Sequence, residues 1–292
     1  MESVLESVKE QKMNKLNAKL GRRRAFSFFM VGLTILSMIL ALTPLFSILG
    51  YVLVKGIPAL NVAFFTELPA PPGEAGGGMA NGIVGTFTLI GLASLIGVPV
   101  GLMAGVFLSE YGRNRFGKLV SFLTDIMLGV PSIVVGIVVY ALVVLWMGGF
   151  SAYAGGVALA FIMIPAVTRT TEEMLKLVPN HIREAGLALG IPKWRVIMLI
   201  ILPTALRGII TGIMLAVARV SGETAPLLFT AFGNMYWNQS LNEPIASMPV
   251  LVFNYAISPY AEWQAQAWAG ALTLILIVLV LNVSARLVTR KR

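Results

Sequence analysis

Long apolar segments recur along this chain of 292 residues, and the shorter stretches between them carry nearly all of the charge. Each apolar segment reaches or exceeds the about 20 residues that a helix needs to cross a membrane. The segments cover residues 25–54, 83–109, 119–147, 151–172, 203–232 and 265–288. This pattern predicts an all-α membrane protein with six transmembrane helices.

The distribution of basic residues tests the number of spans, because Lys and Arg near span ends favour the cytoplasm. With six spans, all but two of the 22 Lys and Arg residues lie at the termini or in and beside the loops after spans two and four. The exceptions are Lys55, on the opposite side, and Arg219, inside span five. This supports separate third and fourth spans, joined by a tight hairpin at Gly148-Gly149. Both termini are then cytoplasmic, as expected for a multi-pass protein of the cell membrane.

The same pattern divides the chain into consecutive parts. The polar N-terminus followed by an apolar segment has the order of a secretory signal, but the segment is too long for a cleaved signal. We therefore expect an uncleaved first helix. The expected parts are a cytoplasmic tail at 1–24, a first transmembrane helix at 25–54, an external loop at 55–82, a core of five transmembrane helices at 83–288 and a cytoplasmic tail at 289–292.

Composition excludes several kinds of site. Cysteine is absent and the single histidine, His181, cannot form a metal cluster alone, so we expect no metal site. The net charge of +9 lies at helix ends, which argues against a nucleic-acid partner. A membrane-embedded enzyme would need His, Asp or Glu clustered at one depth, which this sequence does not supply. The glycine-rich stretch 73–82 lacks the Gly-Lys-Ser/Thr of nucleotide-binding loops, so we expect neither an ATP site nor another cofactor in this chain.

Glycines recur at four-residue spacing on two of the spans. Gly97, Gly101 and Gly105 lie on span two, and Gly208 and Gly212 lie on span five. Small residues on one face let helix backbones approach closely inside a membrane. We predict that these faces pack within the chain, in preference to forming a subunit interface.

The external segments 55–82 and 231–264 differ in composition from the spans. The first is rich in proline and glycine, and the second carries Tyr236, Trp237, Tyr260 and Trp263. Aromatic residues at this level usually anchor helices at the membrane interface. Receiving an external partner is a second role that the sequence leaves equally open.

The longest cytoplasmic loop contains a short helical pattern near 180–190. Its start residues are Pro179 and Asn180, and Gly190 followed by Pro192 is a stop signal. The residues on one face are Ile182, Ala185 and Leu189. Basic residues and Trp194 flank the segment, so an amphipathic helix lying on the membrane surface is one interpretation.

The same loop carries small residues and a later Ile-x-Leu-Pro at fixed spacing. They are Glu184, Ala185, Gly186, Gly190, Ile200, Leu202 and Pro203. This spacing resembles the EAA motif of permease subunits in ATP-binding-cassette importers, which reads Glu-Ala-Ala, three residues, Gly, nine residues and Ile-x-Leu-Pro. Gly186 departs from the motif but keeps its small size. The resemblance implies that a helix in the loop 180–203 docks into a groove of a separate ATPase and passes movement to the spans.

Three further stretches narrow the resemblance. Residues 128–136 read LGVPSIVVG, residues 169–179 read RTTEEMLKLVP and residues 219–226 read RVSGETAP. They resemble phosphate-importer permeases, specifically the A-type subunit of an A/C pair. The likeness extends from about residue 80 to the end of the chain.

The resemblance implies a type I importer permease fold and import of inorganic phosphate into the cytoplasm. The implied partners are two ATPase subunits that bind ATP and Mg²⁺, a homologous second permease in a heterodimer, an external phosphate-binding protein and the lipid bilayer. The same machine for phosphonate, sulfate or molybdate is an alternative. An ion-driven secondary transporter is another, but it would leave the docking helix unexplained.

Arg219 and Glu223 are charged groups inside span five, where charge is expensive and usually faces a cavity or a partner. Their spacing predicts that they share one helix face. Because a planar guanidinium can donate two parallel hydrogen bonds to an oxyanion, we expect the pair to line the substrate pathway, as the resemblance also implies. A pair that only locks helices together is the alternative. Arg169 is a candidate for the cytoplasmic side of the pathway, and we expect Asp125 at a packing boundary.

Overall fold

The computed structural model describes residues 2–290, and all of its regular elements are helices. Met1 and residues 291–292, at the far ends of the predicted cytoplasmic tails, lie outside the described residues. The chain divides into two compact units, Met1–Val54 and Lys55–Arg292. The first unit belongs to one long helix, α1 (Glu2–Gly56), which contains both the predicted tail and the predicted first span. The stretch Phe26–Ala59, which begins in α1 and ends with the short helix Ile57–Ala59, is apolar enough to cross a membrane.

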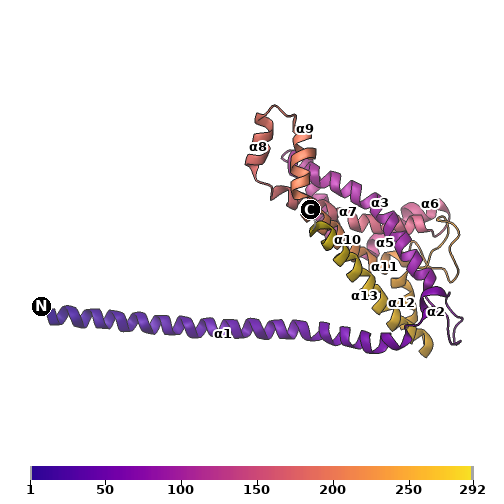
Figure 1. Cartoon of the computed structure of the whole chain (residues 1–292), viewed down its shortest axis with the longest axis horizontal. Helices are drawn as coiled ribbons and strands as arrows, with labels where there is room; N and C mark the ends of the chain where they lie inside the picture. The colour runs from indigo at the N-terminus through magenta and orange to yellow at the C-terminus, as the bar shows by residue number, and fades with distance from the viewer. Residues whose placement is uncertain (1, 291–292) are drawn as a thin grey trace. The chain divides into compact units, whose positions relative to one another are not determined.

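The second unit is a bundle of long helices with short elements at its two ends. The long helices are α3 (Ala80–Tyr111), α4 (Arg115–Gly129), α7 (Ala152–Lys176), α10 (Leu202–Ser221) and α13 (Ala261–Arg290). The short elements are η1 (Ile57–Ala59), α2 (Val62–Thr66), α5 (Ser132–Val139), η2 (Tyr140–Val144), α6 (Leu145–Met147), α8 (Asn180–Ala188), α9 (Lys193–Val196), η3 (Ile197–Ile201), α11 (Ala225–Leu228) and α12 (Met248–Ala256). Figure 1 shows α8 and α9 at one end of this bundle and α2 and α12 at the other.

The number of candidate spans confirms the predicted helical membrane fold. Among the described residues, five helices are long and apolar enough to cross a membrane. The number is six if α4 and the helical stretch after it count as one bent span. The third and fourth predicted spans are separate, because Gly148 ends α6 with a φ of +76° and Ser151 caps the start of α7. Its Oγ accepts a hydrogen bond from the amide of Ala154 at 3.1 Å.

The third predicted span is bent. α4 and the following helical stretch, Ser132–Met147, meet at 106°. The bend falls at Val130 and Pro131, whose backbones are extended. A proline disfavours helical backbone in the residue before it and has no N–H for a helical hydrogen bond. The predicted span 119–147 is therefore not one continuous helix, because Pro131 ends its first half, and it counts as a span only as this bent pair.

The fifth predicted span is shifted along the chain. Its helix starts at Lys193, continues through α9, η3 and α10 and ends at Ser221, well before residue 232. Pro226 has no N–H to donate to the carbonyl of Gly222, and its ring would clash there, so one helix cannot continue through both. The chain leaves α10 at Gly222 and forms the short α11 instead.

The glycine faces pack inside the chain, as their spacing predicts. A Cβ added at Gly101 would lie 2.8 Å from the Cβ of Val167, and one at Gly105 would lie 2.6 Å from the carbonyl oxygen of Thr168. Both contacts are made by α7. Gly208 and Gly212 on α10 likewise face Met174 and Thr170 of α7. The backbones of α3 and α7 therefore nearly touch, and α10 packs its glycines against side chains of α7.

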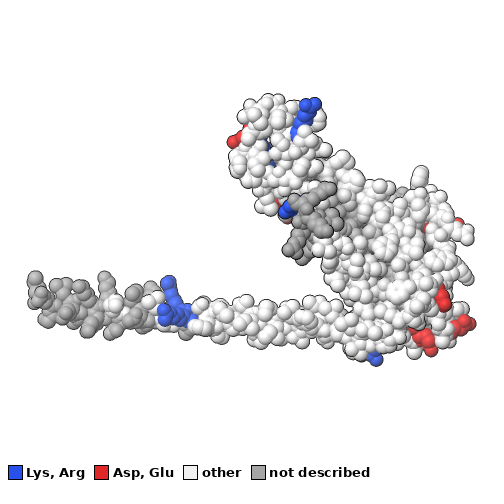
Figure 2. Space-filling view, in the orientation of Figure 1, with Lys and Arg blue, Asp and Glu red and all other residues white. Residues whose placement is uncertain are grey.

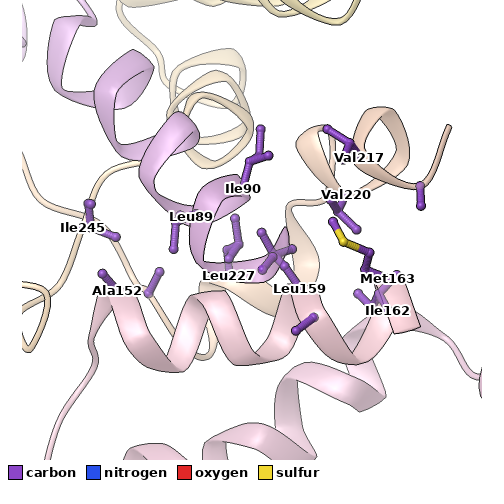
Figure 3. Packing of buried hydrophobic residues seen from close by; sticks show 14 of the residues in the cluster. Leu89, Ile90, Ala152, Leu159, Ile162, Met163, Val217, Val220, Leu227 and Ile245 are labelled. Atoms are coloured by element: carbon purple, nitrogen blue, oxygen red, sulfur yellow. The ribbon is translucent and has the colours of Figure 1, made fainter. Parts of the chain in front are cut away.

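Apolar side chains fill the space where these helices diverge. Figure 3 shows side chains of α3, α7 and α10 meeting beside Leu227 of α11. The labelled members from the three long helices are Leu89, Ile90, Ala152, Leu159, Ile162, Met163, Val217 and Val220. The core thus holds α11, which follows the break in the fifth span, against the long helices.

Candidate functional site: the docking helix and two interrupted spans

The helix predicted near 180–190 is present as α8, which we call the docking helix. It begins after Pro179 and is followed by Gly190, whose φ of +75° lies in the left-handed region that favours glycine. Gly186 is buried in α8. A Cβ at this position would lie 3.0 Å from a methyl of Val196 and 3.4 Å from the Cδ1 of Ile200. Gly186 therefore lets α8 lie closer to Val196 and Ile200 than the alanine of the motif would. Ile200 is the first residue of Ile-x-Leu-Pro.

The other side of the docking helix is exposed. Ile182 is half-buried, whereas Glu184, Ala185 and Leu187 are exposed. Just beyond the helix, 79% of Leu189 is exposed. Apolar side chains left uncovered beside a carboxylate are typical of a surface that another protein covers.

Pro203 connects the loop 180–203, which we call the docking loop, to the fifth span. It stands at the start of α10, directly after the π-helical turn η3. Because proline cannot donate to the carbonyl four residues earlier, the ordinary α-helical pattern is interrupted at Leu199. A π-helical turn is one way in which a helix accommodates such an interruption.

Charged side chains join α4 to α7 on the same end of the bundle. Arg169 forms an ion pair with Asp125 of α4 and donates to Glu172 at 2.7 Å. Lys176 donates to the other oxygen of Glu172 at 2.6 Å. The carboxylate of Glu172 is only 5% exposed, so it depends on both cations for solvation. Asp125 is therefore a packing residue at the α4–α7 boundary, as predicted.

Replacing Arg169 by Ala should lower the thermal stability of the assembled permease. The change leaves the buried Glu172 with Lys176 alone. Removing one partner of a buried ion pair costs about 3–5 kcal/mol, and we expect about 2–3 because 24% of the Arg169 side chain is exposed. Asp125→Asn is the control: that side chain is 56% exposed, so the expected loss is below about 1 kcal/mol. Thermal unfolding of the purified complex measures both, and equal losses would contradict this account.

A cavity of about 760 Å³ opens beneath the docking helix. Its walls come from the end of α3, from α4 and α7, and from α8 and α9. The charged side chains that line it are Glu110, Arg113, Lys118, Asp125, Glu172, Lys176, Arg183 and Lys193. Figure 2 shows Lys and Arg at this end of the second unit, while most Asp and Glu on the visible face lie at the other end. The basic end is the one that the charge distribution assigns to the cytoplasm.

The two interrupted spans meet each other. α5 follows the bend at Pro131 and packs on α11, which follows the break at Gly222. A Cβ at Gly136 would lie 2.7 Å from the Cα of Pro226. Two stretches that carry the family resemblance, 128–136 and 219–226, are therefore in contact. Non-helical backbone at membrane depth occurs where it is buried in protein or lines a water-filled cavity, which makes this contact a candidate site.

Arg219 and Glu223 flank the second interruption. Arg219 is exposed in the last turn of α10, where the negative end of the helix dipole favours a cation. Glu223 is half-buried and lies beyond the end of the helix. The expectation that both share one helix face is wrong, because α10 ends at Ser221. Among the described residues, the recorded ion pairs do not include one between them.

The external segments pack on each other at the opposite end. The indole Nε1 of Trp263 donates to the carbonyl of Ala70 at 3.3 Å, and the side-chain amide of Asn81 donates to the carbonyl of Asn234 at 2.7 Å. Tyr255 stacks on Trp263 with ring centroids 4.4 Å apart. Burial raises the pKa of Tyr255 to about 12. Trp263 thus joins the start of α13 to α12 and to the segment 55–82, a role that the sequence did not indicate.

The sequence analysis did not single out three charged residues at the cytoplasmic end: Glu110, Glu172 and Arg183. A signal for Glu110 was present: it lies in the last turn of a helix, where its charge opposes the dipole and calls for a cation. The partner that supplies this cation, Arg183, lies 73 residues further along the chain.

These features together define a multi-span membrane protein with a partner-docking helix at its cytoplasmic end. The family of binding-protein-dependent transport system inner membrane components matches residues 97–292. The phosphate transport system permease protein PstA of Yersinia pestis is 48% identical over 281 residues, which cover 96% of this chain and 95% of that protein. PstA of Haemophilus influenzae is 48% identical over 266 residues, which cover 91% and 94%.

A solved structure has the same fold. It is a bacterial ABC transporter involved in the import of the acidic polysaccharide alginate, with a TM-score of 0.66, 14% identity and coverage of 94% of this chain and 99% of that one. The chain belongs to the phosphate transport system permease proteins, within the binding-protein-dependent inner membrane components. It is thus a multi-pass transport subunit of the inner membrane, not itself catalytic, in a system that includes an ATPase and a binding protein.

Proposed function

We propose that this chain moves inorganic phosphate into the cytoplasm as one permease of a heterodimer. The second permease is a homologue, two ATPase subunits bind ATP and Mg²⁺, and an external phosphate-binding protein delivers the ion. The observation that carries the substrate assignment is the similarity to phosphate permeases over nearly the whole chain. The exposed face of α8 supports the ATPase partners.

We assign the phosphate pathway to the region around Arg219 and Glu223. The guanidinium of Arg219 can donate two parallel hydrogen bonds to a phosphate oxyanion. Glu223 would weaken that attraction by repelling the ion, and a transit site must release its ion as well as bind it. We keep Arg169 as a candidate for the cytoplasmic side of the pathway; its ion pairs with Asp125 and Glu172 also hold α4 on α7.

We assign ATPase coupling to Glu184, Ala185, Gly186, Gly190 and Pro203. Glu184 and Ala185 lie on the exposed side of α8, where a groove of the ATPase can receive them. Gly186 and Gly190 shape the helix, the first by its close contact with Val196 and the second by ending it. Pro203 joins the loop to α10, so movement of α8 is passed to the fifth span.

Ala185→Arg should release the ATPase subunits from the complex. A long charged side chain in a closely packed interface costs about 2 kcal/mol or more, which corresponds to roughly 30-fold weaker association. Co-purification of the ATPase with this chain measures the effect. Glu243→Gln, at an exposed position in the external segment 231–264, is the control and should keep the ATPase bound. An Ala185→Arg complex that retains its ATPase would contradict docking through this face.

Uptake of labelled phosphate by vesicles that carry the whole transporter tests the substrate. Phosphate should be taken up only when ATP is present on the side of the membrane that carries the ATPase subunits. Excess sulfate, molybdate or phosphonate should not compete with phosphate. Competition by one of these anions as strong as that by unlabelled phosphate would favour the alternative oxyanion. Uptake that needs an ion gradient and no ATP would reject the importer.

A further inference from the structure

Glu110 and Arg183 form an enclosed ion pair beneath the docking helix. Glu110 lies in the last turn of α3, and Arg183 lies in α8. The Nη2 of Arg183 lies 2.9 Å from the Oε1 of Glu110, and its Nε donates to the same oxygen at 3.1 Å. The side chain of Arg183 is 17% exposed and that of Glu110 is 5% exposed. Two nitrogens of the guanidinium therefore bind one carboxylate oxygen in a contact that is largely shielded from water.

The same guanidinium also holds the end of α7. It donates to the carbonyl of Leu175 at 2.6 Å and to the carbonyl of Val178. The amide of Val178 also donates to the carbonyl of Leu175, at 3.2 Å, so Arg183 adds a charged donor to the last carbonyls of α7. One side chain of the docking helix thus binds the ends of both α3 and α7.

Lys193 attaches the other limb of the docking loop to the same place. Its ammonium donates to the backbone carbonyl of Glu110 at 2.7 Å and lies 4.0 Å from the ring centroid of Tyr111. Lys193 begins α9, which leads through η3 into α10. The end of α3 is therefore held from both sides of the docking loop.

Movement of this end cannot be absorbed easily between α3 and α7. The glycine face described above brings the two backbones together at Gly101 and Gly105, with hardly any free space. A closely packed interface transmits displacement because it has few alternative arrangements. A pull on Glu110 would therefore move α3 and α7 as a pair.

We propose that the Glu110–Arg183 pair is the link by which the docking helix moves α3 and α7 together. This inference rests on the proposed function, since it assumes that an ATPase moves α8. Glu110 is a positioning residue in this role: it acts on the pathway through α3 and touches neither ATP nor phosphate. The link adds a second route beside the connection from the docking loop into α10.

The test uses the whole transporter in vesicles and measures phosphate moved per ATP hydrolysed. Glu110→Gln keeps the size of the side chain and removes its charge. We expect phosphate uptake to fall about tenfold, a change in the range reported for residues in coupling networks, while basal ATP hydrolysis stays within about twofold. The additional ATP hydrolysis that loaded binding protein stimulates should fall with uptake.

A cross-link separates transmission from simple support of the fold. The chain has no cysteine, so the double variant Glu110→Cys, Arg183→Cys carries two thiols and no other in this chain. Before cross-linking this variant should be as poorly coupled as Glu110→Gln. A short bifunctional thiol reagent should then restore phosphate moved per ATP, which a fold that was merely damaged would not regain.

The controls distinguish failure of the link from failure of the proposed function. Arg113→Gln changes an exposed cation in the wall of the same cavity and should leave coupling unchanged. If the unaltered transporter moves no phosphate, the proposed substrate is rejected. The ATP hydrolysis that loaded binding protein stimulates, compared between the unaltered transporter and Glu110→Gln, then still tests the link. Unchanged coupling in Glu110→Gln overturns the link. Loss of the bound ATPase from that variant also overturns it, because the pair would then serve docking.

Discussion

Arg219→Gln is expected to remove most of the phosphate uptake while the complex still assembles. The arginine is exposed in the last turn of α10, so its removal leaves no cavity in this chain. Its charge would be lost beside the break at Gly222, around which the proposed pathway runs. Losing charge-assisted hydrogen bonds to an ion costs about 1.5–3 kcal/mol, and uptake should fall at least tenfold to a hundredfold. Uptake by vesicles and the yield of purified complex measure the two effects.

Two further variants make the Arg219 prediction specific. Arg219→Lys keeps the charge but loses the planar pair of donors, so uptake should be intermediate. Arg207→Gln alters an exposed arginine nearer the cytoplasmic end of the same helix and should transport normally. Near-normal uptake by Arg219→Gln would contradict a role in transport. The arginine would then only stabilise the end of α10 through the helix dipole.

Gly105→Ala is expected to be the most damaging change of a single methyl among the glycines of the α3 face. The added Cβ would lie 2.6 Å from the carbonyl oxygen of Thr168 and 2.6 Å from the Cβ of Thr171, so α3 and α7 must separate. Overpacking of a close contact costs about 1–3 kcal/mol, and here the obstacle is backbone, which cannot rotate away. The midpoint of thermal unfolding of the purified complex should fall accordingly.

Gly91 and Gly97 complete a graded series on the same helix. A Cβ at Gly91 meets nothing within 4 Å, so Gly91→Ala should be neutral or stabilising by up to about 1 kcal/mol, the intrinsic helix preference for alanine. Gly97 faces the flexible Met163 at 3.0 Å, so Gly97→Ala should fall between the two. Equal stability across the three variants would show that the face does not set the helix separation.

The number and direction of the spans could be predicted from the sequence, but their interruptions could not. Apolar runs and basic flanks report membrane crossing, because the bilayer sorts residues by polarity. A break inside an apolar run changes neither property. Pro131 was present in the sequence, but a proline can also kink a transmembrane helix without ending it. The residues after Ser221 remain apolar, so hydropathy carried the predicted helix on to residue 232.

The docking helix could be predicted because its signals are local. Pro179, Gly190 and the spacing of small residues lie within one short stretch of the sequence. The ion pairs beneath it join residues far apart, such as Glu110 and Arg183, and their partners are chosen by the packing of α3 on α7. The same packing decides that Arg169 is neutralised by Asp125. Such pairs follow from the tertiary structure and have no pattern of their own.

The contact of Gly186 with Val196 and Ile200 fixes a length of chain. These residues meet because Gly190 turns the chain back, and α9 and η3 then place Val196 and Ile200 on the side that faces Gly186. Each residue of an α-helix turns the chain by about 100°, so removing one residue from the helical segment after Pro192 would point Val196 and Ile200 away from the docking helix. Side chains in this segment can vary. Its number of residues cannot change without separating Gly186 from Ile-x-Leu-Pro.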